Sequence, residues 1–214
     1  MPRVSEILDR FPEPYLIEWK LKKGAVECKR ISDEALLVGS IVDLWIQKDI
    51  REEYYELSLP DKEIEALVRQ QIMNCMNAWN KFKKDHPGFI EKAKRFKDRM
   101  QAELVMGDLV GHPDFIFDDE LPDLKTSSSI SKSHWMQTSI YTHMAQLQLG
   151  LSIHKASILR LDKKDPNGVY EYKSIDRDEI SFWQRKFLIR YEIYKEDQEF
   201  HNMTRKKLEE EKLA

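Results

Sequence analysis

The residues of this chain best suited to chemistry are two aspartates and a lysine, Asp114, Asp123 and Lys125, near the middle of its 214 residues. Asp123 and Lys125 are two positions apart, so in a strand they would point to the same face. Carboxylate oxygens are the ligands that hard divalent cations prefer, and a lysine supplies positive charge for a developing oxyanion. Hydrolysis of a phosphodiester needs both functions, so the three residues predict a metal-dependent nuclease centre.

The spacing of an acidic residue, any residue and a lysine is not informative by itself. It recurs in this chain, starting at Glu18, Glu27, Asp162, Glu171 and Glu210. The surroundings of Asp123 and Lys125 are what distinguish them. Apolar segments flank Gly107 and Asp108, a two-residue turn signal, so 103–117 is predicted to form a hairpin. A third strand is predicted after the turn at 118–121.

Two pairings set the expected register: Met106 opposite Leu109 in the first hairpin, and Phe117 opposite Pro122 in the second. Because side chains alternate between faces, the polar residues of the three strands then share one face. They are Glu103, His112, Asp114, Asp123 and Lys125, with Asp114 opposite Lys125. The apolar residues share the other face, which is expected to pack on a core. They are Leu104, Met106, Leu109, Phe115, Phe117 and Leu124.

This arrangement resembles the PD-(D/E)XK nuclease superfamily, and within it the RecB-like exonucleases, which include stand-alone phage and organellar enzymes. The resemblance extends over residues 4–160. It includes an opening helix at 4–8, Gly39 and Asp43 in the family's Gly-x-x-x-His segment, and Gln137 and Tyr141 in its Gln-x-x-x-Tyr motif. The implied fold is α/β with a restriction-endonuclease-like core. In that core a mixed central sheet, containing an antiparallel three-strand meander, is flanked by helices.

Carried over by position, the resemblance implies that Asp114 and Asp123 bind Mg²⁺ or Mn²⁺, with help from Glu103 and the Leu124 carbonyl. Lys125 would orient water or stabilise the transition state. Its neighbour Asp114 is expected to keep the lysine protonated, because a nearby opposite charge favours the ionised form. A half-exposed strand glutamate beside a turn is common, so Glu103 has a purely structural alternative.

Asp43 departs from the family, which has histidine at this position. An aspartate there is either an oxygen ligand that favours hard cations, a sign of weakened activity, or a solvent-facing residue. Gln137 and Tyr141 are four apart on a predicted helix, so they share a face that is expected to contact a phosphate; packing on the sheet is the alternative. Ser127 is a further expected nucleic-acid contact. His112 has a chemical role, contacts DNA or faces solvent.

A basic cluster precedes the first strand and is expected to guide a DNA backbone to the centre. It consists of Lys81, Lys83, Lys84, Lys92, Lys94, Arg95, Lys97 and Arg99, with Lys92, Lys94 and Arg95 as the chosen DNA contacts. The alternative is a solvated helix face. The net charge of −3 is low for a dedicated nucleic-acid binder, so the local distribution of charge matters more. The acidic turn at 118–120 is expected to lie away from this path.

Composition predicts one domain, 1–214, because 41% of the residues are hydrophobic and 34% are charged. It would comprise a helical part at about 1–100, a core at about 101–175 and a C-terminal helix at about 176–212. Periodicity predicts helices at 61–85, with Ile64 in its apolar stripe, and at 131–150. A further hairpin is predicted at 153–161 and 169–175, across the turn at 165–168.

Several classes of protein are not expected. Cys28 and Cys75 alone cannot form a disulfide framework or a four-cysteine iron–sulfur cluster. The chain contains no apolar run long enough for a membrane span and no secretory signal, so we expect no membrane association and a cytoplasmic location. It contains no Gly-x-x-x-x-Gly-Lys loop, so ATP is not an expected ligand. Any helicase or recombination partner would be a separate protein. The sequence is also compatible with a homo-oligomer.

Together these features predict a Mg²⁺- or Mn²⁺-dependent deoxyribonuclease that degrades DNA from its ends, in repair, recombination or phage replication. One alternative is a structure-selective or restriction-like endonuclease with the same centre. Another is a nucleic-acid-binding module whose metal site has decayed, which the departure at Asp43 would explain. The presence of Asp114, Asp123 and Lys125 favours an enzyme.

Overall fold

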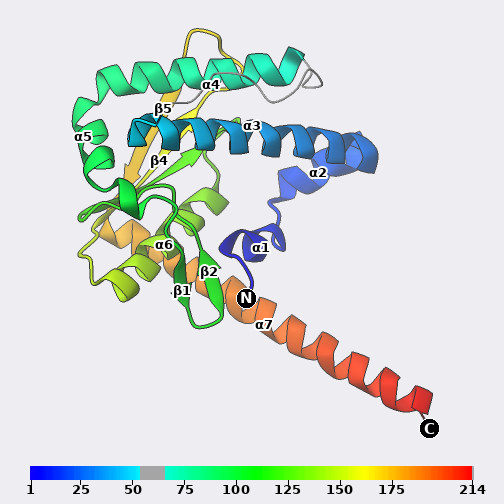
Figure 1. Ribbon diagram of the computed structural model, residues 1–214. Coiled ribbons are helices and arrows are strands. Elements are labelled where there is room, and N and C mark those ends of the chain that lie inside the picture. Colours follow the sequence, from blue (N-terminus) through cyan, green and yellow to red (C-terminus); the bar gives the residue numbers. More distant parts are fainter. Residues whose placement is uncertain (54–65, 214) are drawn as a thin grey trace.

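The computed structural model describes residues 1–53 and 66–213, and within them the predicted α/β class is confirmed (Figure 1). The helices are α1 (Val4–Asp9), α2 (Pro14–Lys23), α3 (Ala25–Arg51), α4 (Ala66–Asp85), α5 (Pro87–Arg95), α6 (Lys132–Leu149) and α7 (Arg177–Leu213), with a short 3₁₀ helix at Lys97–Arg99. The strands are β1 (Leu104–Met106), β2 (Leu109–Gly111), β3 (Glu120–Lys125), β4 (Lys155–Leu161) and β5 (Tyr170–Ile175).

The sheet that positions the candidate site has the order β3-β4-β5. β3 pairs with β4 in parallel, and β4 pairs with β5 antiparallel, so the sheet is mixed as predicted. β1 and β2 form a separate two-stranded sheet. The described strands therefore do not form the expected three-strand meander, because β3 takes its ladder partner from a segment about 35 positions later in the sequence, a pairing that local patterns do not reveal.

The register of the first hairpin is as predicted, with Met106 opposite Leu109. Gly107 has a φ of 62°, the left-handed conformation that this tight turn requires. The prediction for the second turn is wrong by two residues. Phe117 N–H donates to the Glu120 carbonyl at 2.9 Å, so the turn comprises only two residues, and Phe117 lies opposite Glu120 instead of Pro122.

This shift changes which residues face one another at the candidate site. Phe115 N–H donates to the Pro122 carbonyl at 3.3 Å, which places Asp114 opposite Asp123 instead of Lys125. Because the shift is two residues, Asp114 still shares a face with Asp123 and Lys125, as predicted. The two carboxylates are thereby brought side by side.

Helices cover both faces of the β3-β4-β5 sheet (Figure 1). On one face, Phe115, Phe117 and Leu124 pack into a core with α3, α4 and α5; on the other, Leu104 and Leu109 pack into a second core with α6 and α7. The prediction that these residues share a single apolar face is therefore wrong. Leu104 and Leu109 belong to the separate β1-β2 sheet, so side-chain alternation along β3 does not decide which core they enter.

The helices and the β4–β5 hairpin agree with the sequence patterns. Ser131 caps α6 by accepting a hydrogen bond from His134 N–H, and Gly150 ends it with a φ of 65°. α4 buries the predicted stripe from Val68 to Phe82, whereas Ile64 and the predicted helix start at 61–65 lie outside the described residues. None of the helices in the described part of the chain combines the length and the apolar character needed to span a bilayer.

Candidate active site

The centre of the candidate site is the carboxyl end of β3, where Asp123 and Lys125 point to the same side of the strand. Asp123 is only 2% exposed, and its Oδ2 forms an ion pair with Lys125 Nζ. Apart from this lysine, no group among the described residues donates a hydrogen bond to the same oxygen. A buried carboxylate whose main partner is one lysine retains lone pairs that can bind a cation or water.

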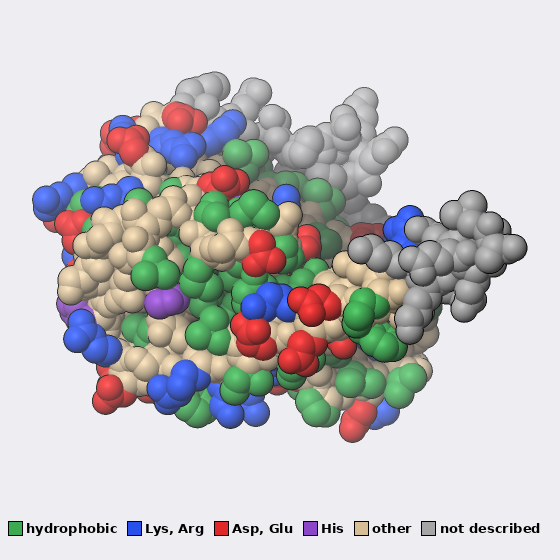
Figure 2. Space-filling model, turned by 90° about the horizontal axis from the view of Figure 1, so that it is seen from below, with side chains coloured by type: hydrophobic (Ala, Val, Ile, Leu, Met, Phe, Trp, Pro, Cys, Tyr) green, Lys and Arg blue, Asp and Glu red, His purple; other side chains and the backbone are tan. Residues whose placement is uncertain are grey.

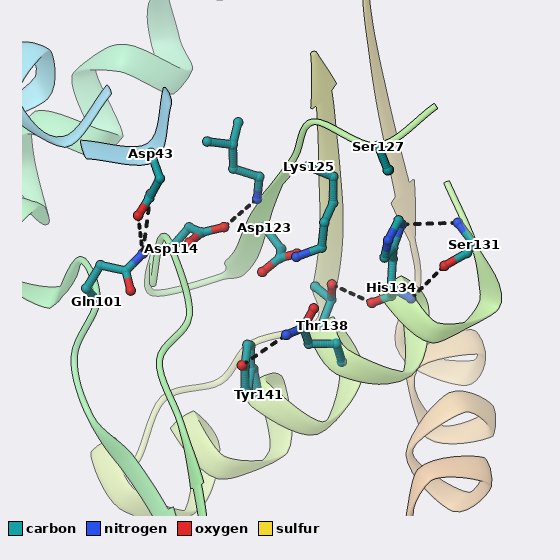
Figure 3. Close-up of polar contacts among 12 residues, drawn as sticks. Asp43, Gln101, Asp114, Asp123, Lys125, Ser127, Ser131, His134, Thr138 and Tyr141 are labelled. Atoms are coloured by element: carbon teal, nitrogen blue, oxygen red, sulfur yellow. Dashed lines mark hydrogen bonds and ion pairs between the residues drawn. The ribbon is translucent and has the colours of Figure 1, made fainter. Parts of the chain in front are cut away.

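Asp114 lies in the loop between β2 and β3 and is held at both oxygens (Figure 3). Its Oδ2 accepts a hydrogen bond from Leu124 N–H at 2.6 Å, and its Oδ1 accepts one from Gln101 Nε2 at 2.7 Å. Gln101 itself has a φ of 57°, a left-handed conformation that is uncommon for residues with a side chain. Its backbone N–H donates to Pro113 O at 3.0 Å, which ties this unusual turn to the loop that bears Asp114.

Asp43 approaches the other two aspartates from α3. Gln47, one turn further along α3, donates to Asp43 Oδ2 at 2.8 Å, and Gln101 Nε2 lies 3.4 Å from both Asp43 oxygens. Gln101 therefore bridges Asp43 and Asp114 (Figure 3). Gly39 precedes Asp43 by four residues, so the two share one face of the helix, and a β-carbon at Gly39 would lie 3.6 Å from Thr126 Oγ1.

Helix α6 supplies Gln137 and Tyr141, the pair expected from the sequence. Gln137 Nε2 donates to the Tyr141 hydroxyl at 3.1 Å, which confirms that they share a face. The Tyr141 ring is 6% exposed and packs directly against Gly111 at the end of β2. Burial, followed by the charge of Asp123, raises the pKa of Tyr141 to about 12, so its phenol keeps its proton at neutral pH.

His134 also comes to this region from α6, although the sequence analysis does not select it. Its Nδ1 accepts a hydrogen bond from Ser131 N–H at 3.1 Å, so the proton of the neutral ring lies on Nε2. Burial, and then the charge of Lys125, lowers the pKa of His134 to about 3. The imidazole is thus a neutral hydrogen-bond donor at physiological pH.

The electrostatics of the site follow from three aspartates close to one lysine. Burial, followed by the charges of Asp123 and Asp43, raises the pKa of Asp114 well above its usual value. Burial also raises the pKa of Asp43, with a contribution from Asp123. For Lys125, burial alone would lower the pKa, but Asp123 and Asp114 outweigh it and raise the pKa. The lysine therefore stays protonated, as expected. Its ion-pair partner, however, is Asp123 and not the expected Asp114.

A cavity of about 550 Å³ opens onto these residues. It is lined by Ser32, Ala35, Leu36, Gly39, Ser40, Asp43, Asp114, Leu124, Lys125, Thr126, Ser127 and Lys163. A second cavity of about 540 Å³ shares Ser32 and Ser127 with the first and extends past His134 to α2. The predicted contact Ser127 thus lies where the two cavities meet, and its hydroxyl donates to Ser129 O at 2.9 Å.

Other predicted site residues lie elsewhere. The Glu103 side chain is 65% exposed just before β1, and its Oε2 lies 3.9 Å from His112 Nε2. Neither residue lines the two cavities described above. The predicted metal-ligand role of Glu103 therefore gains no support from its position. The Leu124 N–H binds Asp114, and the predicted role of its carbonyl stays a prediction.

The basic residues chosen as DNA contacts lie on α5 and do not line the cavity at Lys125. Lys92 forms an ion pair with Asp119 at 2.9 Å, and Lys94 forms one with Glu52 at 2.5 Å. Arg95 lies over the Phe96 ring, 5.1 Å from its centroid. In addition, Arg99 pairs with Asp118 at 2.7 Å. The expectation that the acidic turn lies away from the basic cluster is wrong, because Asp118 and Asp119 neutralise two of its members.

The donor set at β3 consists of oxygen atoms, which suits Mg²⁺ or Mn²⁺ better than softer metals. Across residues 1–53 and 66–213, no three His, Cys, Asp or Glu side chains come together in a geometry that could hold a metal ion. Mg²⁺ usually retains several water ligands and is held by one or two carboxylates together with substrate phosphate. Asp114 and Asp123 fit a site of this type.

Gln101 and Lys163 are site residues that the sequence analysis misses. Gln101 follows the short 3₁₀ helix and carries no motif; only its contacts with two aspartates reveal it. Lys163 lies in the turn after β4 and lines the same cavity as Lys125, and burial lowers its pKa. Lys163 is the middle residue of the acidic-x-Lys segment that starts at Asp162, and that segment is not informative by itself. Nothing in the sequence therefore distinguishes this lysine.

Comparison with models of protein families gives no match to this chain, and comparison with curated proteins gives none. The functional argument therefore rests on the geometry of the site.

Proposed function

We propose that this protein is a metal-dependent nuclease that hydrolyses phosphodiester bonds of DNA with Mg²⁺ or Mn²⁺, attacking from the ends. The observation that carries the proposal is the juxtaposition of Asp114, Asp123 and Lys125 at the end of β3, beside an open cavity of about 550 Å³. The preference for ends, and a role in repair, recombination or phage replication, rest on the resemblance to RecB-like exonucleases.

The site residues would have two roles, which are binding of the cation and stabilisation of negative charge on the phosphate. Asp114 and Asp123 would hold the metal, and their mutual repulsion makes a divalent cation favourable there. The bound ion would supply Lewis acidity, lowering the pKa of an attacking water and neutralising a phosphate oxygen. Lys125 remains a cation and would stabilise the negative charge that develops on the phosphorane.

Two neutral donors lie close enough to Lys125 to interact with its charge. The Tyr141 phenol and the His134 Nε2–H both keep their protons at neutral pH, so either can donate to a non-bridging phosphate oxygen. Lys163, which lines the same cavity as Lys125, would contact a phosphate of the incoming strand as a point charge. DNA would thus be held by this cavity, whereas the paired lysines of α5 are less available.

The test is cleavage of linear and covalently closed circular DNA, each labelled, in Mg²⁺, in Mn²⁺ and with EDTA. We expect metal-dependent loss of the linear substrate, and Lys125→Met should lower the turnover rate at least about a hundredfold, as removal of one charge-stabilising donor does. Lys29→Met, an exposed lysine of α3, is the matched control and should retain activity. Cleavage of circles would replace the exonuclease with an endonuclease.

A nucleic-acid-binding module without catalysis is the second candidate, and one observation favours it. Asp43 occupies the position of a family histidine, and its carboxylate is engaged by Gln47 and Gln101. If DNA binds tightly but is not cut with any divalent metal, this candidate replaces the enzyme.

A further inference from the structure

Among the residues whose burial is described, helix α7 has one buried and one exposed apolar face. Ile180, Phe187 and Tyr191 are buried against the body of the protein. Ile189, Ile193 and Phe200 are exposed, and at 3.6 residues per turn they lie within about 40° of one another, on the opposite side of the helix from the buried residues. Met203 continues the exposed stripe and is 57% exposed. Regularly spaced apolar residues on a solvent-facing helix mark a docking surface.

The C-terminal half of α7 projects away from the rest of the molecule (Figure 1). Three exposed glutamates, Glu192, Glu196 and Glu199, run along one side of the apolar stripe. Figure 2 shows acidic and hydrophobic side chains next to one another on the side of the molecule toward which α7 extends. A surface that fits this helix would therefore be an apolar groove with a basic rim.

Such a groove lies between α2 and α3. A cavity of about 450 Å³ is lined by Ile17, Lys20, Leu21, Gly24, Ala25 and Cys28. Leu21 is 80% exposed, and Val26, near the start of α3, is 86% exposed. Lys20, Lys22 and Lys23 all lie in the last turn of α2, and each is exposed. The groove is thus apolar like the α7 stripe, and its lysines are opposite in charge to the glutamates beside that stripe.

We propose that the occupant of this groove is the projecting part of α7 from a second copy of the chain, so that two copies exchange these helices. The α7 of one copy would place Phe200 and Met203 against Leu21, with its glutamates facing the lysines of α2. A twofold axis makes the exchange reciprocal, so each dimer contains two identical contacts. This inference does not depend on the nuclease activity proposed above.

The experiment measures the mass of the full chain in solution by light scattering over a range of concentrations. The wild-type protein is expected to have twice the 25.5 kDa mass of one chain. Phe200→Glu and Leu21→Glu should each raise the dissociation constant at least about thirtyfold, the size expected of an interface hot spot. Salt should weaken the wild-type dimer, because opposite charges face one another. Leu147→Glu alters a leucine on α6 that is 63% exposed, close to the 64% of Phe200, and should not change the mass.

Mixing the two variants separates helix exchange from other dimers. A pair of Phe200→Glu and Leu21→Glu chains retains one contact in which both the helix and the groove are intact, so the mixture should recover dimer that neither variant forms alone. Circular dichroism verifies that both variants are folded, and both positions are exposed in the single chain. A monomeric wild type at millimolar concentration, or a Leu21→Glu variant that dimerises as the wild type does, would overturn the proposal; the latter would indicate α7 pairing with α7. Failure of the mixture to dimerise would overturn the reciprocal exchange.

Discussion

Replacement of Gly111 by alanine should destabilise the protein through steric overlap with Tyr141. A β-carbon at this position would lie 2.3 Å from Tyr141 Cε1 and 2.8 Å from Cδ1. Non-bonded carbons prefer separations of about 3.5 Å or more, so the ring would have to move by about 1.2 Å. That movement is resisted, because the side chain packs in a core with Leu104 and Leu109 and is hydrogen-bonded to Gln137.

The cost can be estimated because the backbone does not contribute to it. Gly111 is not one of the glycines with a positive φ, so an alanine can adopt its conformation and the penalty is steric alone. Overpacking of a buried position costs about 1–3 kcal/mol of unfolding free energy. For a chain of this size, that corresponds to a melting temperature lower by about 3–10 °C.

Urea unfolding followed by tryptophan fluorescence measures this change, with two controls. Gly88→Ala places a β-carbon where nothing lies within 4 Å, in helix α5, and should leave stability unchanged or raise it by up to about 1 kcal/mol. In a Tyr141→Ala background, Gly111→Ala should cost almost nothing. The reasoning would be refuted if Gly111→Ala cost less than about 0.5 kcal/mol, or cost the same in both backgrounds.

Four further outcomes are expected. Mn²⁺ at about one hundred times its dissociation constant should raise the melting temperature of the wild type by about 5–10 °C, and calorimetry should find this increase absent in Asp114→Asn. Because the folded-state pKa values of Asp114 and Asp43 are raised, the metal-free unfolding free energy should fall as pH rises from about 4 through those values, and Asp43→Asn should flatten this decline in urea titrations. Lys163→Met should make the slope of log K for DNA binding against log salt shallower by about 1; an unchanged slope would exclude its contact with phosphate. Gly168→Ala should cost more than about 1 kcal/mol, since φ is 74° and a β-carbon would lie 2.8 Å from the Asn77 backbone; wild-type stability in urea would contradict this.

The sequence by itself determines the elements whose signals are local. Gly107 and Asp108 predict the β1–β2 hairpin and its register, and Ser131 and Gly150 predict the two ends of α6. These predictions succeed because turns and helix caps are stabilised by hydrogen bonds between residues only a few positions apart. The spacing of two residues between Asp123 and Lys125 likewise places both on one side of a strand, and the ion pair between them confirms it.

Only the tertiary structure decides how these elements meet. The parallel pairing of β3 with β4 joins segments separated by a whole helix, and no local pattern encodes it. The same holds for the bridge that Gln101 makes between Asp43 and Asp114, and for the ion pair of Lys92 with Asp119. Such contacts depend on which faces two helical layers bury against the sheet, and that choice is made by packing of the whole chain. The sequence therefore determines which groups are present for chemistry, whereas packing sets their distances, charges and pKa values.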